Sequence, residues 1–278
     1  MRRLPAAIAI LRPHNMLATA ASVVVGYHLA GGAAYTTVVL PAVFTALVTG
    51  LGNLINDYYD ADIDRINRPA RPIPSGRLTR GYVRGAYWTG TVLVTLPLVA
   101  ALPGRLAALM VGWEALLFLY ARGGKRLPLL GNVAISAIVS SAFLAGAMLA
   151  GRIAPVGFVL GLAFLLVMGR ELVKGAEDME GDRLAGASTL AVRIGAERTV
   201  AWAALPLLLC VVAAPLPGLL RVYARSYAIA VGITSTPLVL AALFLVLRSQ
   251  ERPVLRRGSW MLKLGMLFGI AAMALARR

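Results

Sequence analysis

Residues 37–77 read "TVVLPAVFTALVTGLGNLINDYYDADIDRINRPARPIPSGR", an apolar run that changes abruptly into a charged one. Residues 37–56 carry no charged side chain, and they match the length of about 20 residues that a helix needs to cross the hydrocarbon layer of a membrane. Four aspartates follow within nine residues, and arginines come after them at positions 65, 68, 71 and 77. The stretch therefore predicts a membrane-crossing helix with a charged site at its end.

The composition extends this interpretation to the whole chain. Of the 278 residues, 59% are hydrophobic and 14% are charged, and the mean hydropathy is +0.77, which is unusual for a water-soluble domain. We expect an all-α, polytopic membrane protein with about nine transmembrane helices in one bundle, forming a single domain over residues 1–278. The expected crossings are 14–31, 37–56, 82–102, 104–121, 129–150, 154–174, 198–214, 224–247 and 258–276.

The basic residues indicate how the chain lies in the membrane. The net charge of +16 is spread between apolar runs, which favours contact with the anionic lipids of a bilayer and argues against nucleic acid as a partner. With nine alternating crossings, most Lys and Arg residues fall on one side, which the positive-inside rule identifies as cytoplasmic. We therefore expect a multi-pass protein of the cell membrane whose connections 57–81 and 175–197 face the cytoplasm.

A second acidic cluster resembles the first. At about 100° per residue, Glu171, Asp178 and Asp182 share one helix face, while Glu177 and Glu180 are expected to be solvated. Asp178 and Asp182 repeat the four-residue spacing of Asp60 and Asp64. Crowded carboxylates stay ionised only beside a cation, and a set of oxygen ligands without Cys or His favours Mg²⁺ with phosphate completing its coordination.

The arginines supply the opposite charge. Arg65, Arg68, Arg71 and Arg77 lie in a proline-stiffened loop directly after the first cluster. A guanidinium can bind phosphate oxygens in a bidentate manner, so this pattern predicts a diphosphate between the acids and the arginines. The alternative is that acids and arginines pair with one another as ordinary surface ion pairs.

These residues resemble the UbiA superfamily of intramembrane prenyltransferases. The two motifs stand here as Asn56-x-x-x-Asp60-x-x-x-Asp64 and Asp178-x-x-x-Asp182, and family-like pieces occur in order along the chain, namely "LRPHN" at 11–15, "YARGGKR" at 120–126 and "EGDRLAGASTLAVRIG" at 180–195. The first motif together with "RELVKGAEDMEGD" is most similar to the archaeal ether-lipid branch. The resemblance implies Mg²⁺-dependent transfer of a geranylgeranyl group from its diphosphate to the hydroxyl of geranylgeranylglyceryl phosphate.

The resemblance and the charge pattern together suggest a role for each candidate residue. The expected metal ligands are Asn56, Asp60, Asp64, Asp178 and Asp182, the four aspartates also being the expected catalytic residues; the expected diphosphate-binding residues are Arg68, Arg71, Lys125 and Lys174; and the expected acceptor-binding residues are Arg12, Asn15, Tyr120 and Asn132. For three of these residues a second interpretation stays open. Lys174 could neutralise the neighbouring acids, Arg12 could extend to the membrane surface, and Tyr120 could be an interfacial tyrosine.

Two other functions remain possible from the sequence. An aromatic prenyltransferase acting on 4-hydroxybenzoate or a related quinone precursor would share the metal site and differ in its acceptor pocket. A cation transporter would use the acids as an ion pathway, but transport sites generally lie near the bilayer midplane, and these acids lie at helix ends. The chain length of the prenyl group and the oligomeric state do not follow from the sequence.

Overall fold

The computed structural model describes residues 3–124 and 127–277, and these residues form helices and connecting turns without a β-strand. Lys125, one of the expected diphosphate-binding residues, lies outside the described residues. The helices are α1 (Arg3–Leu11), α2 (Pro13–Leu29), α3 (Thr36–Asn67), α4 (Arg80–Ala101), α5 (Gly104–Arg122), α6 (Leu130–Ser140), α7 (Ala142–Leu149), the 3₁₀ turn η2 (Ala154–Val156), α8 (Gly157–Leu184), α9 (Leu190–Ile194), α10 (Ala196–Ala213), α11 (Leu216–Leu219), α12 (Arg225–Ile233), α13 (Ser235–Arg248) and α14 (Arg252–Met273).

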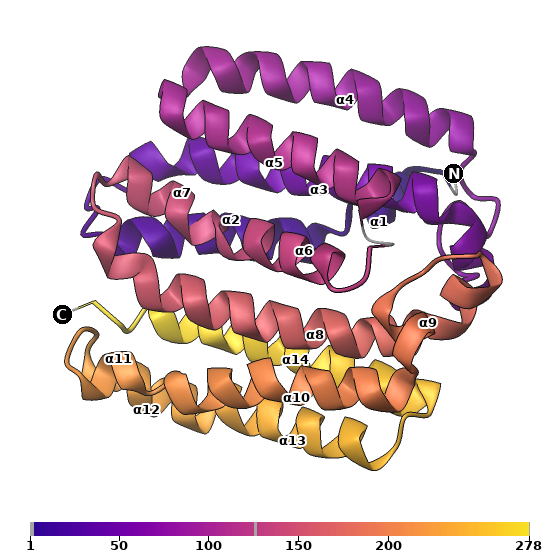
Figure 1. Cartoon of the computed structure of the whole chain (residues 1–278). Helices are drawn as coiled ribbons and strands as arrows, with labels where there is room; N and C mark the ends of the chain where they lie inside the picture. The colour runs from indigo at the N-terminus through magenta and orange to yellow at the C-terminus, as the bar shows by residue number, and fades with distance from the viewer. Residues whose placement is uncertain (1–2, 125–126, 278) are drawn as a thin grey trace.

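The long helices run side by side, and the two termini lie at opposite ends of the bundle, as an odd number of crossings requires (Figure 1). Each expected crossing corresponds to one helix or to two consecutive ones. Among the described residues, six helical segments are long and apolar enough to cross a membrane, and a seventh candidate is the pair α1 and α2, which is bent by 41°. The multi-pass, all-helical fold is confirmed, whereas the exact number of nine crossings is not, because α4 and α14 fall outside this set.

Two apolar cores hold the bundle together. The first joins α8 to α10 and α12–α14, and the second joins α1–α7. The seam between α2 and α7 depends on glycines: a Cβ at Gly26 would lie 2.0 Å from the carbonyl oxygen of Phe143, and one at Gly146 would lie 1.9 Å from that of Val23. Such close backbone contact is possible only with small residues, as in other membrane helix pairs.

Two helices continue well beyond their apolar segments. The α3 helix extends to Asn67 and the α8 helix to Leu184, past the expected crossing ends at 56 and 174. Both extensions lie at the end of the bundle where α9 is found (Figure 1). The acidic motifs are therefore carried by regular helix, which holds their side chains in the register that helical periodicity predicts.

Candidate functional site

A polar cavity lies where the extended ends of α3 and α8 meet. It encloses about 790 Å³ of empty space, including the part that opens to solvent. Residues from both acidic motifs line it, together with residues of α5, α6, α9 and the loop after α3; the polar and charged ones are Asn56, Asp60, Arg68, Arg71, Tyr120, Asn132, Glu171, Lys174, Asp178, Asp182, Thr189 and Thr199. Most of the residues expected from the sequence are therefore brought to one cavity.

The acids of α3 have two different environments. Asn56 Nδ2 donates a hydrogen bond of 2.8 Å to Asp60 Oδ2, so these two oxygen-bearing side chains form a pair on the cavity wall. Asp64 is buried beside them and does not line the cavity. Its carboxylate is 2.5 Å from Arg71 Nη1, which also lies 3.2 Å from Asp57 Oδ1. Arg71 therefore forms ion pairs with two buried carboxylates.

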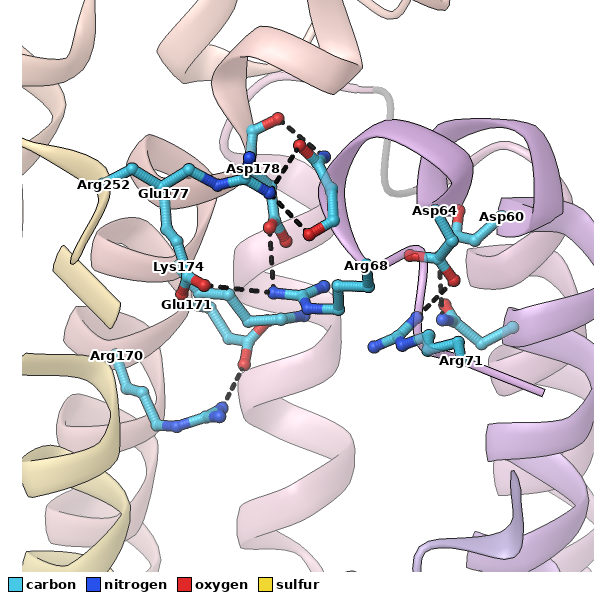
Figure 2. Close-up of polar contacts among 12 residues, drawn as sticks. Asp60, Asp64, Arg68, Arg71, Arg170, Glu171, Lys174, Glu177, Asp178 and Arg252 are labelled. Atoms are coloured by element: carbon cyan, nitrogen blue, oxygen red, sulfur yellow. Dashed lines mark hydrogen bonds and ion pairs between the residues drawn. The ribbon is translucent and has the colours of Figure 1, made fainter. Parts of the chain in front are cut away.

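Arg68 links the loop after α3 to the acids of α8. Its Nη2 lies 2.8 Å from Asp178 Oδ1 and 3.7 Å from Glu177 Oε1 (Figure 2). Burial opposes the charge of the guanidinium, but Asp178, Glu177 and Asp64 outweigh it and raise the pKa of Arg68 above its ordinary value. The expectation that Glu177 is solvated was wrong: the residue is buried, because Arg68 reaches it from a different segment. Glu180, in contrast, is exposed as expected.

A hydrogen-bonded junction fixes the two motifs relative to each other. Asn67 Nδ2 donates to the backbone oxygen of Asp178 at 3.0 Å. Arg252, at the start of α14, donates from Nη2 to the backbone oxygen of Asn67 at 2.5 Å and to its Oδ1 at 3.2 Å. Gly181 leaves the space that the Asn67 side chain occupies. We refer to Asn67, Gly181 and Arg252 as the three-helix junction.

The expected acceptor-binding residues divide into two groups. Tyr120 and Asn132 line the polar cavity. Arg12 and Asn15 do not: Arg12 contacts Asp57 and Asn53 at the break between α1 and α2, and Asn15 accepts a hydrogen bond of 2.8 Å from Lys263. Lys174, an expected diphosphate-binding residue, lines the cavity and is 3.8 Å from Glu171 Oε2, so its two possible roles remain compatible with its position.

Three charged residues near the cavity carry no role in the sequence-based assignment. Glu171 was recognised as part of the acidic face and left without a role, although it lines the cavity and pairs with Arg170 at 2.7 Å. Arg170 and Lys263 were not singled out. Both stand in apolar stretches expected to cross the membrane, where an ionisable side chain is costly and therefore a signal of function.

The donor chemistry of the cavity fits Mg²⁺. The oxygen-bearing side chains on its wall that could hold the metal are those of Asn56, Asp60, Asp178 and Asp182. This hard cation requires only one or two carboxylates when phosphate and water supply the other oxygens. Within the described residues no three His, Cys, Asp or Glu side chains gather closely enough to form a protein-only metal site. The arrangement thus suits a metal that is shared with a phosphate ligand.

Comparison with known proteins found relatives that match most of the chain. The sequence model of the UbiA prenyltransferase family matches residues 17–275. The chain is 38% identical to a digeranylgeranylglyceryl phosphate synthase of Methanothermobacter thermautotrophicus, over 96% of this chain and 94% of that one. It is 36% identical to a protein of the same name from Methanopyrus kandleri, over 95% of this chain and 96% of the relative.

Solved structures share the fold. A structure from work on digeranylgeranylglyceryl phosphate synthase in membranes superimposes with a TM-score of 0.74 at 27% identity and covers 99% of both chains. A UbiA homolog from Archaeoglobus fulgidus, bound to DMAPP and Mg²⁺, superimposes with a TM-score of 0.69 at 19% identity and covers 97% of this chain and 99% of its own.

Proposed function

Because the chain belongs to the UbiA prenyltransferase family, we propose that it transfers a geranylgeranyl group from its diphosphate to the free hydroxyl of geranylgeranylglyceryl phosphate, with Mg²⁺ as cofactor. The acceptor follows the names of relatives that match almost the whole chain. In the reaction, the bond between the allylic carbon and the diphosphate oxygen breaks. An ether bond to the glycerol oxygen forms, the hydroxyl loses its proton, and diphosphate leaves.

One observation carries this proposal: acids from α3 and α8 and two arginines line the same cavity. Negative charge accumulates on the departing diphosphate as its bond to carbon breaks, so groups positioned for that charge lower the barrier. Arg68 and Arg71 can each donate to phosphate oxygens from the cavity wall.

The metal ligands of the proposal are Asn56, Asp60, Asp178 and Asp182, with Asp64 as a further candidate one turn after Asp60. When bound, Mg²⁺ would supply electrostatic stabilisation of the diphosphate oxygens. Asp64 and Arg71 hold each other at 2.5 Å, so Asp64 also positions an arginine of the site. Lys174 adds a cation on the same wall and, in this proposal, contacts the diphosphate.

The surroundings of the cavity meet two further needs of the reaction. An allylic cation must be protected from water, and we infer that the prenyl chain and its allylic carbon lie on the side of the cavity that faces the apolar interior of the bundle. The acceptor must lie close to the allylic carbon. In this proposal Tyr120 and Asn132, which line the cavity, position the acceptor together with Arg12 and Asn15. Residues 1–278 form a single domain whose site opens toward the cytoplasm, as the basic loops suggest.

The proposal is tested with purified protein in lipid vesicles. Geranylgeranyl diphosphate is supplied with geranylgeranylglyceryl phosphate or with 4-hydroxybenzoate, each with Mg²⁺ or with EDTA. The expected product is the doubly prenylated glyceryl phosphate, formed only with Mg²⁺. Product formed with 4-hydroxybenzoate and not with the glyceryl phosphate would overturn the acceptor assignment. Equal turnover in Mg²⁺ and in EDTA would exclude a role for the metal. Cation flux without any prenyl transfer would favour a transporter.

A further inference from the structure

A second group of polar side chains lies deeper in the bundle than the acidic motifs. Lys263 of α14, Arg170 of α8 and Asn15 of α2 form this group, which we call the Lys263 cluster. Lys263 Nζ donates to Asn15 Oδ1 at 2.8 Å, and Lys263 and Arg170 lie close enough for their charges to act on each other. Since a helix rises about 1.5 Å per residue, Arg170 lies about 12 Å from Asp178 along α8.

Positive charge in the Lys263 cluster exceeds the negative charge available to it. Arg12 and Lys174 also act on Lys263, and their effect, like that of Arg170, is larger than the opposing effect of Glu171. Glu171 is already shared between Arg170 at 2.7 Å and Lys174 at 3.8 Å, and Asp57 is engaged by Arg12 and Arg71. Within the described residues Lys263 has no ion pair with a carboxylate; its other contact is the ring of Trp260, 5.2 Å away.

One donor in this cluster also lacks an acceptor. Arg170 Nε is buried and, within the described residues, has no hydrogen-bond partner. Buried polar groups are nearly always paired, because an unpaired one loses its hydration without compensation. Lys263 is partly buried and has no carboxylate partner among the described residues, and a cation that loses hydration without a counter-charge carries a penalty of the same kind. An anion bound at the Lys263 cluster would relieve both.

The position of the cluster indicates what kind of anion it binds. An apolar cavity with about 610 Å³ of empty space lies between α2, α7, α8, α10 and α14. On α8 this cavity ends at Val167 and the polar cavity begins at Glu171, so Arg170 separates the two. On α14 the cavity begins at Met266, one turn after Lys263. Figure 2 shows Arg170 beyond Glu171, on the side away from Asp178.

We propose that Lys263, Arg170 and Asn15 bind the phosphomonoester of an amphiphilic acceptor whose hydrocarbon chain enters the apolar cavity. The proposal rests on the proposed function and adds the site at which the acceptor's phosphate is recognised. The donor diphosphate occupies the region of Asp60, Asp178 and Asp182; along α8, Asp178 lies about two helical turns from Arg170 and Asp182 about three. The free hydroxyl of the acceptor lies between the two anions, and this arrangement places it beside the allylic carbon.

A phosphomonoester fits this location better than the carboxylate of a small aromatic acid. A phosphate ester carries up to two negative charges and three free acceptor oxygens, which matches two cations and the unpaired Arg170 Nε. A cluster that separates a polar cavity from an apolar one is suited to a ligand with a charged head and a long apolar chain. A compact aromatic acid has no group to occupy the apolar cavity.

The test measures binding without catalysis. Purified protein in detergent, without donor and without metal, is titrated with geranylgeranylglyceryl phosphate and with geranylgeranylglycerol, which lacks the phosphate. The wild-type chain is expected to bind the phosphate lipid at least ten times more tightly than the alcohol. Lys263→Met is expected to abolish this preference, Lys263→Arg to retain most of it, and Arg257→Ala, which removes an exposed cation from the same helix, to leave it unchanged.

Steady-state kinetics supply the second measurement. Lys263→Met is expected to raise the KM for the acceptor at least ten-fold and to leave the KM for geranylgeranyl diphosphate unchanged. Equal weakening of both lipids, retention of the phosphate preference in Lys263→Met, or a rise in the donor KM alone would each overturn the proposal. If Lys263→Met does not fold, the Lys263→Arg variant supplies the test. The proposal would then be overturned if Lys263→Arg kept less than half of the wild-type preference for the phosphate lipid over the alcohol. Wild-type turnover of the aromatic acid alone would instead contradict the proposed function, and the binding titration separates the two failures.

Discussion

Replacing Gly181 by alanine should disrupt the three-helix junction and through it the active site. A Cβ at this position would lie 2.4 Å from Nδ2, 2.5 Å from Cγ and 2.6 Å from Oδ1 of Asn67. These separations are shorter than any van der Waals contact, so the Asn67 side chain has to leave its place. It would then lose its hydrogen bonds to the backbone of Asp178 and from Arg252, which are 3.0 and 3.2 Å long.

The cost follows from the bonds that are lost. A neutral hydrogen bond contributes about 1 kcal/mol, and one that involves a charged group about 1.5–3 kcal/mol. The greater helix propensity of alanine returns up to about 1 kcal/mol. We expect a net loss of about 2–3 kcal/mol, equivalent to a fall in Tm of about 4–12 °C for a chain of this size. Because Asp178 and Arg68 are displaced together with Asn67, kcat should fall as well.

Thermal unfolding in detergent and prenyl transfer in vesicles measure the two effects. Gly161→Ala is the matched control, since a Cβ at this α8 position meets no atom within 4 Å. The Asn67→Ala background provides a stricter control. Once the Asn67 side chain has been removed, Gly181→Ala should lower the free energy of unfolding only slightly. A Gly181→Ala variant with wild-type Tm, or one whose destabilisation persists in full in the Asn67→Ala background, would refute the reasoning.

Three other changes test separate parts of the structure. Gly26→Ala places a Cβ 2.0 Å from a carbonyl oxygen across the α2–α7 seam and should lower the Tm more than Gly181→Ala does. Gly112→Ala has open space around its Cβ and should leave the Tm unchanged. Thermal unfolding in detergent measures both variants. Arg68→Ala removes the guanidinium that lies 2.8 Å from Asp178 and should raise the KM for prenyl diphosphate by about ten-fold or more. Arg68→Lys, which keeps a positive charge, should recover part of this loss. An unchanged KM in Arg68→Ala would exclude a role of Arg68 in diphosphate binding. Asp182→Asn should lower kcat by about a hundred-fold, as expected when one group that stabilises transition-state charge is lost, and turnover at saturating Mg²⁺ measures it.

The periodicity of the sequence was sufficient to predict the helical fold and the acidic side chains of the cavity wall, whereas Arg68 and Arg71 followed from the charge pattern and Tyr120 and Asn132 from the resemblance. Apolar runs long enough to cross a membrane identify helices because the bilayer permits little else. Asn56 and Asp60 could be assigned to one face because a regular helix fixes the direction of every fourth side chain. The convergence of α3 and α8 was predicted from the repeated spacing of their acids and is what the cavity shows.

Contacts between distant segments could not be predicted in this way. Glu177 was expected to be solvated because its own helix face gave no partner; its burial depends on Arg68, which comes from another segment. The pair of Asn15 and Lys263 joins residues 248 positions apart, and no local pattern records that proximity. The number of crossings is likewise uncertain from composition, because α4 and α14 carry polar residues that packing against neighbouring helices can accommodate.

In the proposed site, acids from two helices bind one diphosphate through shared Mg²⁺, and this sharing is measured by the affinity for a non-reactive prenyl diphosphate analogue. Titrations with Mg²⁺ and with EDTA are compared for the wild-type chain, Asp60→Asn and Asp182→Asn. The account predicts that Mg²⁺ strengthens binding to the wild-type chain and that either substitution alone removes most of this gain. A gain that survives in one of the two variants, or binding that is equally strong in EDTA, would contradict it.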